Sequence, residues 1–343
     1  MQQALRVVLA GCGGMAGAWL GSVKNKTDVE IVGLVDINEE AAIKRKADFE
    51  LERASTGSDL SSMLMAMKPD AVFDCTVPES HVSVTLTALE HGCHVLGEKP
   101  LADTMENAAR MIRAAKEAGK IYAVIQNRRY DLRIRGFREF IASGRIGPLT
   151  TLNSDFYIGA HFGGFRDRME HVLLLDMAIH SFDQARFLSG ADPVAVYCHE
   201  WNPSASWYDH DASAVAIFEM TGGLIYTYRG SWCAEGVNTT WECDWRAIGE
   251  NGTAAWNGAD QYRAQAVTGP GGFHSALMDA RIGPAEVGKQ GGHAGLIEEF
   301  LECIRTGGVP ETICTDNVKS LAMVFGAIES AKTHQRIEIS LPA

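Results

Sequence analysis

LRVVLAGCGGMAG, residues 5–17, is the stretch that decides the fold of the first part of the chain. The apolar run at 5–10 predicts a buried strand, and the small residues after it predict a tight turn into a helix. The spacing matches Gly-x-Gly-x-x-Ala: Gly11 allows the turn, Gly13 lets backbone approach a pyrophosphate, and Ala16 lets the helix pack closely on the strand. On its own, such a turn also fits a strand-to-helix connection that binds no ligand.

A second expected strand ends in an acidic residue at the distance that a dinucleotide site requires. Val29–Val35 is apolar apart from Glu30, and Asp36 follows it about twenty residues past the glycines. A carboxylate there accepts hydrogen bonds from a ribose diol and repels a 2′-phosphate, which predicts NAD as the cofactor. Lys44 and Arg45 on the next helix keep NADP possible. The alternative role for Asp36 is a helix N-cap or turn residue.

Strands and helices alternate through the rest of the first third. Strands are expected at Ala71–Cys75, His94–Glu98 and Ile121–Gln126, and helices at Glu79–Glu90 and Thr104–Ala118. This alternation predicts an α/β fold with a doubly wound parallel sheet, a Rossmann domain over residues 1–126. Ligands bind at the carboxyl ends of the strands in such sheets.

The alternation of expected strands and helices ends after Gln126. Strands expected at Leu149–Ile158, Ala212–Glu219, Leu224–Trp232 and Glu242–Gly249 are separated by turn signals rather than by helices. Residues 127–343 are therefore predicted to form an α+β domain for substrate binding and oligomerisation, with a large, open and mainly antiparallel sheet. Its tryptophans and tyrosines favour a homodimer or homotetramer formed through this sheet.

Composition limits the classes of function. The 343 residues are 46% hydrophobic and 22% charged, which is typical of a globular protein, and the net charge of −12 comes without a basic cluster. Nucleic acid and anionic membranes are therefore not expected partners, and a small-molecule substrate is. No apolar run reaches membrane-spanning length.

Eight cysteines are spread through the chain without a Cys-x-x-Cys pair, so reduced buried thiols and a cytoplasmic location are expected. The sequence Leu9-Ala10-Gly11-Cys12 also resembles a lipoprotein processing box. The apolar run before it is shorter than the roughly seven residues of a signal h-region, however.

Glu98-Lys99-Pro100 places a cation at the end of an expected inner strand and then stops that strand with proline. Three further motifs accompany it. They are the glycine fingerprint, Thr76-Val77-Pro78 with His81, and Asn127-Arg128-Arg129-Tyr130. Together these motifs resemble the glucose-fructose oxidoreductase, inositol dehydrogenase and rhizopine-catabolism (Gfo/Idh/MocA) family over nearly the whole chain.

The fingerprint and the resemblance together imply a set of cofactor-binding residues at the carboxyl ends of the first strands. They are Gly11, Cys12, Gly13, Gly14, Met15, Asp36, Thr76, Pro78, His81, Glu98, Lys99 and Asn127.

Leu173–His180 is an apolar segment in which the spacing of Asp176 and His180 puts both side chains on one helical face. The pair could be a buried ion pair, two ligands of a metal, or an acid-base pair. No metal site is predicted, because His161, His171 and Asp209-His210-Asp211 have no ligand spacing. The resemblance implies the third alternative, with Asp176 and His180 as the catalytic pair.

Substrate-binding candidates lie around this segment. Family members commonly have a glycine-rich turn where this chain has Arg168–Val172, so His171 is a candidate specificity residue. The resemblance suggests Arg128 and His293 as well. Position in an expected strand or loop adds Asp155, Tyr157 and Arg166.

The resulting hypothesis is an NAD-dependent dehydrogenase that acts on a secondary alcohol of a sugar, glycoside or cyclitol. His180 would be the general base, Lys99 would stabilise the alkoxide, and Asp176 would orient the substrate and His180. Two alternatives stay open: an NAD-assisted glycosidase or lyase, and a non-catalytic sugar sensor that binds NAD.

Overall fold

The computed structural model describes residues 4–342, which divide into two compact units. The first unit comprises the chain up to Asn127 together with Gln290–Leu321, and the second comprises Arg128–Lys289 together with Ala322–Leu341. The division between the units falls after Asn127, and Gln290–Leu321, in the C-terminal third of the chain, belongs to the first unit.

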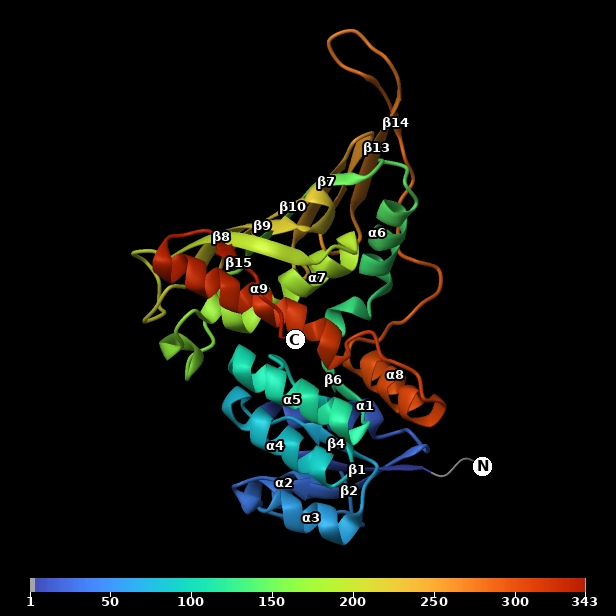
Figure 1. Cartoon of the computed structure of the whole chain (residues 1–343), viewed down its shortest axis with the longest axis vertical. Helices are drawn as coiled ribbons and strands as arrows, with labels where there is room; N and C mark the ends of the chain where they lie inside the picture. Colours follow the sequence, from blue (N-terminus) through green and yellow to red (C-terminus); the bar gives the residue numbers. More distant parts are fainter. Residues whose placement is uncertain (1–3, 343) are drawn as a thin grey trace. The chain divides into compact units, whose positions relative to one another are not determined.

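Parallel strands form the sheet of the first unit, in the order β3-β2-β1-β4-β5-β6 (Figure 1). The strands are β1 (Leu5–Ala10), β2 (Val29–Val35), β3 (Ser55–Gly57), β4 (Ala71–Asp74), β5 (His94–Gly97) and β6 (Tyr122–Val124). The helices between them are α1 (Gly14–Val23), α2 (Glu39–Asp48), α3 (Leu60–Met67), α4 (Pro78–Glu90) and α5 (Met105–Ala118). The strand order reverses between β1 and β4, which is where ligands bind in doubly wound sheets. The predicted Rossmann topology is confirmed.

Helix α8 (His293–Thr306) returns to the first unit and packs on α1. Arg305 pairs with Asp28 at 2.8 Å, Lys26 pairs with Glu298 at 3.4 Å, and the ring of Phe300 lies 6.4 Å from that of Phe73. These contacts join positions more than two hundred residues apart, so the local sequence pattern gives no sign of them. The following helix α9 (Cys314–Thr333) begins in the first unit and ends in the second.

A nine-stranded mixed sheet forms the second unit, in the order β14-β13-β12-β11-β7-β10-β9-β8-β15. Its strands are β7 (Leu149–Tyr157), β8 (Pro193–Trp201), β9 (Ser213–Met220), β10 (Ile225–Ser231), β11 (Asp244–Gly249), β12 (Gly252–Trp256), β13 (Tyr262–Gly269), β14 (Ala276–Asp279) and β15 (Ile337–Glu338). The expected antiparallel succession holds for β9 and β10. It fails for β10 and β11, because β7 lies between them and runs parallel to β10. Leu152 and Phe156 of β7 are fully buried, which an inner position in the sheet provides.

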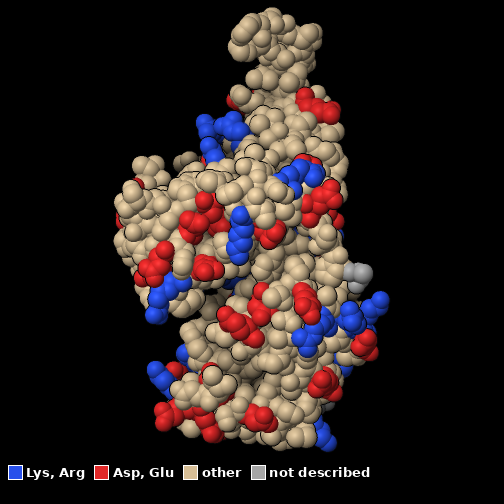
Figure 2. Space-filling model, turned by 60° about the vertical axis from the view of Figure 1, so that its left-hand side comes forward, with Lys and Arg blue, Asp and Glu red and all other residues tan. Residues whose placement is uncertain are grey.

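Helices cover one face of this sheet and leave the other open (Figure 1). The covering elements are α6 (Leu132–Ala142), the π-helical turn η3 (Leu173–Ala178) and α7 (Ile179–Ser189). Phe182 of α7 packs edge-on against Phe218 and Tyr228, with ring centroids 4.8 and 5.3 Å apart. Acidic and basic side chains are interspersed over the face shown in Figure 2. No helix within residues 4–342 is both long enough and apolar enough to cross a bilayer.

His94 at the start of β5 gives a test of stability against pH. Its Nδ1 accepts a hydrogen bond from the backbone N–H of Ile121 at 3.0 Å, and burial, assisted by the charge of Lys120, lowers the pKa of His94 to about 4. Since this pKa lies below the unfolded value of about 6.5, the stabilisation is complete above pH 6.5 and is lost as the pH falls towards 4. His94→Asn keeps an acceptor that does not titrate. We expect its Tm to fall less than that of the wild type between these pH values, whereas an equal fall would contradict the assignment.

Candidate functional site

Gly11 makes the turn at the end of β1 possible. Its φ is +86°, and a Cβ at this position would lie 2.6 Å from the backbone carbonyl atoms of Cys75 and 2.7 Å from the nitrogen of Thr76. The strand end of β4 therefore occupies the space that any side chain would need. The sequence fingerprint and the packing thus both require glycine at position 11.

The next residues leave an open surface at the start of α1. A Cβ added at Gly13 or Gly14 would meet no atom within 4 Å. The helix has no side-chain cap and no acidic residue in its first turn, so its N–H groups and positive dipole end suit an anion. Met15 is 43% exposed beside them, whereas Cys12 is buried and its pKa is raised to about 12 by burial and by the charge of Asp36.

Asp36 stands at the end of β2 as the fingerprint requires. Its carboxylate accepts hydrogen bonds from the backbone N–H groups of Cys12 at 2.7 Å and Asn38 at 2.9 Å. Arg45 donates to the carbonyl oxygens of Cys12 at 3.3 Å and Gly13 at 2.8 Å. These contacts fix the glycine loop against β2 and α2. The glycines without Cβ obstruction, the uncapped helix and the carboxylate together fit a dinucleotide.

The Glu98-Lys99-Pro100 turn is held by side chains from several elements. The buried Glu98 accepts from the indole N–H of Trp19 at 2.7 Å and from the backbone N–H of Lys99 at 3.2 Å. One residue past the proline, the hydroxyl of Tyr122 donates to the carbonyl oxygen of Leu101 at 2.9 Å. Glu98 is thus a support of the Lys99 turn, and Lys99 leaves β5 at the carboxyl edge of the sheet.

Thr76, Pro78 and His81 follow β4 at the same edge. Thr76 donates its backbone N–H and its hydroxyl to Asp74, at 3.0 and 2.5 Å. Pro78 is the first residue of α4, a position that suits its fixed φ. His81 is only 1% exposed, and both ring nitrogens lie at hydrogen-bond distance from backbone carbonyls. Both ring nitrogens are thus engaged by the backbone, and the role of His81 towards the cofactor stays a prediction.

Asn127 and His293 lie together in the first unit. The amide nitrogen of Asn127 is 3.3 Å from Nδ1 of His293, the first residue of α8. Burial lowers the pKa of His293, while the charge of Glu98 acts in the opposite direction. The structure thus gathers Glu98, Asn127 and His293 from three distant parts of the chain.

In the second unit, Asp176 lies in the π-helical turn η3, and His180 lies one turn later in α7. Such widened turns occur frequently at functional sites. The Asp176 carboxylate accepts from Nε of Arg166 at 2.8 Å and from Nη2 at 3.4 Å. The guanidinium of Arg166 in turn lies 4.9 Å from the ring centroid of Phe162 and 4.8 Å from that of Phe165. Asp176 and Arg166 therefore form an ion pair whose guanidinium also lies against two aromatic rings. No sequence pattern indicated this pair.

His171 and Arg128 take part in separate networks of the second unit. His171 has a φ of +52°, and its Nδ1 lies 2.6 Å from the buried carboxylate of Glu200. Arg128 donates to the carbonyl oxygen of Trp241, and its guanidinium lies 3.3 Å from the sulfur of Met177 and 3.8 Å from Glu242. Met177 follows Asp176 directly, so the Arg128 network adjoins the expected catalytic pair.

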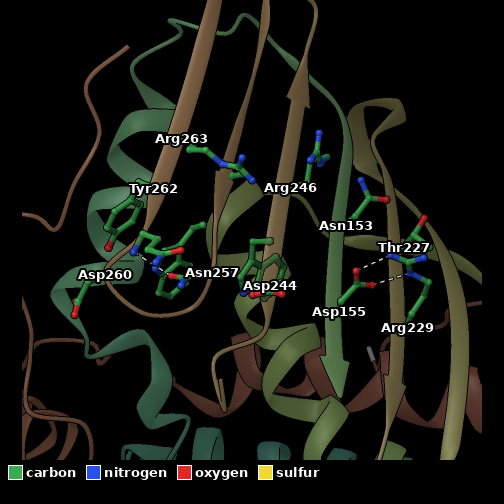
Figure 3. A pocket seen from close by; sticks show the side chains of 14 residues that line it. Asn153, Asp155, Thr227, Arg229, Asp244, Arg246, Asn257, Asp260, Tyr262 and Arg263 are labelled. Atoms are coloured by element: carbon green, nitrogen blue, oxygen red, sulfur yellow. Dashed lines mark hydrogen bonds and ion pairs between the residues drawn. The ribbon is translucent and has the colours of Figure 1, made fainter. Parts of the chain in front are cut away.

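Asp155 and Tyr157 lie on the other face of the sheet. Along β7, Leu152, Ser154 and Phe156 are buried against the helices, and the alternate residues point to the open face. Figure 3 shows Asp155 there, paired with Arg229 at 2.5 and 2.7 Å in a hollow of about 890 Å³. Strand alternation thus places Asp155 and Tyr157 on the face opposite to Phe156, and their role as substrate residues stays a prediction.

Known families match both units. Residues 5–126 match the model described as "Oxidoreductase family, NAD-binding Rossmann fold", and residues 134–255 match "GFO/IDH/MocA C-terminal domain". The chain belongs to the GFO/IDH/MocA oxidoreductase family. The expected family, oxidoreductase class and NAD cofactor are thereby confirmed.

Relatives of the chain match it over nearly its full length. An uncharacterised protein of Sinorhizobium fredii is 30% identical, over 97% of this chain and 95% of its own. The 1,5-anhydro-D-fructose reductase of Ensifer adhaerens is 26% identical, over 96% and 97%. An oxidoreductase from Agrobacterium radiobacter, solved with NAD+, L-tartaric acid and magnesium, has a TM-score of 0.85 at 21% identity, covering 98% and 99%. The last likeness shows the shared fold.

Several residues of this GFO/IDH/MocA protein were missed by sequence reasoning. Glu200 holds His171, Trp19 holds Glu98, and Asp183 forms a buried pair with Arg129 at 2.6 Å. Each partner is tens of residues away, and no spacing rule links them. Among residues 4–342, no three histidine, cysteine, aspartate or glutamate side chains are grouped so that they could hold a metal ion.

Proposed function

We propose that this protein is an NAD-dependent dehydrogenase that transfers a hydride between nicotinamide and a secondary alcohol of a sugar, glycoside or cyclitol. The observation that carries the proposal is the firmly held turn that presents Lys99 at the carboxyl edge of a dinucleotide-binding sheet. A relative named for reduction of an anhydro sugar supports the substrate class. NAD, when bound, supplies the hydride acceptor.

Side chains of the protein accept the proton and stabilise the charge on the substrate oxygen. His180 takes the hydroxyl proton, since histidine suits this role near neutral pH. The Lys99 ammonium donates to the same oxygen and stabilises its negative charge. Asp176 orients the substrate and His180, with its own carboxylate held by Arg166. Arg128, His171 and His293 are retained as candidate substrate residues.

A panel of sugars, glycosides and inositols tests the reaction. We expect NADH absorbance to appear with at least one member and NAD, with a weaker response to NADP because of Asp36. Bond cleavage without net NADH formation would favour the NAD-assisted glycosidase or lyase instead. NAD binding without turnover of any member would favour the sensor.

Arg166→Leu tests the support of Asp176. We expect kcat/KM to fall about 10- to 100-fold, because an unsupported carboxylate loses its orientation, while NAD affinity stays within about threefold. Arg168→Leu removes an equal charge from the same 3-10 turn (Arg166–Arg168) and serves as the control. Equal effects of the two substitutions would show that charge alone matters.

We also propose that the open face of the second sheet joins copies of this chain. Tyr197 and Ile217 lie opposite each other on β8 and β9, and they are 47% and 45% exposed. The nearby hollow is lined by both acidic and basic side chains (Figure 3). The same patch on two copies of the chain could therefore pair opposite charges.

Ile217→Arg tests this interface. We expect a smaller species in sedimentation, because the substitution would bury a charge in the apolar contact. Val287→Arg, at a position 81% exposed in the same unit, should leave the size unchanged. An unchanged size for Ile217→Arg would contradict the proposed face. We further propose a cytoplasmic location, where the eight free cysteines would remain reduced.

A further inference from the structure

Three partly exposed aromatic residues gather in two loops of the second unit. Phe162 and Phe165 lie in the loop after β7, and Trp241 lies in the loop between β10 and β11. They are 42%, 64% and 48% exposed. The rings of Phe162 and Trp241 pack on the buried Trp232, with centroids 5.2 and 5.6 Å from its own. We call Phe162, Phe165 and Trp241 the aromatic platform.

Ala160 anchors the first of these loops. Its carbonyl oxygen accepts hydrogen bonds from the indole N–H of Trp207 at 2.9 Å and from the hydroxyl of Tyr208 at 2.6 Å. Its backbone N–H donates to the carbonyl oxygen of Trp232 at 3.2 Å. The loop is therefore fixed to the residue on which the platform packs, although its phenylalanine rings face solvent in part.

Two guanidinium groups connect the platform to the proposed catalytic pair. Arg166 lies within 5 Å of both phenylalanine ring centroids and donates to the Asp176 carboxylate at 2.8 Å. Arg128 donates to the backbone carbonyl oxygen of Trp241, and its Nη2 lies 3.3 Å from the sulfur of Met177, the residue after Asp176. The platform and Asp176 are thus parts of one continuous surface of the second unit.

The size and the chemistry of the platform favour a small ligand over a protein. At their observed exposures, three aromatic side chains of about 150–250 Å² each offer roughly 300 Å². Each partner of a typical protein interface buries about 800 Å². Ligand sites commonly combine aromatic surface with a few hydrogen-bonding groups. A pyranose ring matches this combination, because its C–H face stacks on aromatic rings and its hydroxyls accept from guanidinium groups.

We propose that the aromatic platform binds the second pyranose ring of a glycoside, while the first ring reacts beside Asp176. This inference rests on the proposed dehydrogenase function and narrows its substrate to glycosides with a sugar aglycone. The second ring stacks on the exposed faces of Trp241 and Phe165, and its hydroxyls accept hydrogen bonds from the guanidinium groups. Monosaccharides and cyclitols lack this ring and are the poorer substrates.

Matched pairs of ligands test the platform without turnover. Each pair is a disaccharide with glucose, galactose or mannose at its non-reducing end and the methyl glycoside of that sugar with the same anomeric configuration. Titration calorimetry in saturating NADH measures the Kd of both members. In at least one pair we expect the disaccharide to bind at least about tenfold more tightly, because only it covers the aromatic rings. Equal affinities in every pair, or no binding by any disaccharide, would overturn the proposal.

Substitutions in the platform test which residues hold the second ring. In Phe165→Ala and in Trp241→Leu we expect the preference for the disaccharide to fall to about threefold or less, with the Kd of the methyl glycoside unchanged within about twofold. Phe273→Ala and Trp201→Leu are the matched controls, because these residues of the same unit are 98% and 39% exposed and lie outside the platform. A preference that persists in both platform variants would overturn the proposal.

Turnover of the same pairs with NAD separates this proposal from the proposed function. Oxidation of disaccharides and methyl glycosides with equal kcat/KM would overturn the platform and leave the dehydrogenase in place. A disaccharide preference in Kd without oxidation of any member would support the platform and contradict the dehydrogenase. We expect the preference in both measurements.

Discussion

A Lys99→Met protein should bind NAD within about threefold of the wild-type affinity and lose about 10²- to 10³-fold in kcat, the range observed when one donor to a developing oxyanion is removed. Methionine has a similar length and no charge, so the turn should keep its shape. Its supports are the Glu98 carboxylate, the Tyr122 hydroxyl and the buried His81. These bonds reach the backbone of the turn and not the Lys99 side chain.

The measurement pairs stopped-flow turnover with NADH fluorescence titration. Lys24→Met, at a salt bridge on the surface of the same unit, is the control for loss of a lysine charge. A Lys99→Met protein that binds NADH and turns over at the wild-type rate would remove Lys99 from the mechanism. Loss of NADH binding together with turnover would assign Lys99 to the cofactor instead.

Gly11→Ala is the second substitution for which we expect a large effect. The new Cβ would lie 2.6 Å from the backbone of Cys75, and the φ of +86° is one that alanine rarely adopts. Both effects require the ends of β1 and β4 to separate, which should cost about 2–4 kcal/mol of folding free energy. NAD affinity should fall at least about tenfold, because the glycine loop and α1 start from this turn.

Gly14→Ala separates the two consequences. Its Cβ meets no atom within 4 Å, and position 14 begins a helix, so stability should be equal or greater by up to about 1 kcal/mol. Any loss of NAD affinity in Gly14→Ala then reports contact with the cofactor alone. Equal Tm values for the Gly11 and Gly14 variants would contradict the packing explanation.

Local pattern was sufficient for the N-terminal part of the first unit, residues 4–127, because its signals are short in range. The boundaries expected for Leu5–Ala10 and Val29–Val35 match β1 and β2. Apolar runs set the strands, glycines set the turn, and the crossover rule set the parallel order. The same signals placed Lys99 at a strand end and Asp36 beside the glycines, and the family match agrees with the resulting Rossmann domain.

Side-chain partners and faces depended on the folded chain. Arg166 reaches Asp176 across a loop, and His171, in the turn before η3, reaches Glu200 on β8. A long side chain can reach many possible partners, so spacing along the sequence does not define which pair forms. Asp155 illustrates a second difficulty. Its strand was expected, but the sequence did not indicate which face of that strand is buried against the helices.

The sequence by itself thus determined the cofactor domain, the family resemblance and the polar residues that the chemistry needs. Only the tertiary structure decided that 290–321 returns to the first unit, that β7 lies between β10 and β11, and that His81 faces two carbonyls. The physical reason is the separation along the sequence over which each effect acts. Periodicity and turn chemistry act over a few residues, whereas burial and hydrogen bonding are satisfied by whichever groups the whole fold brings together.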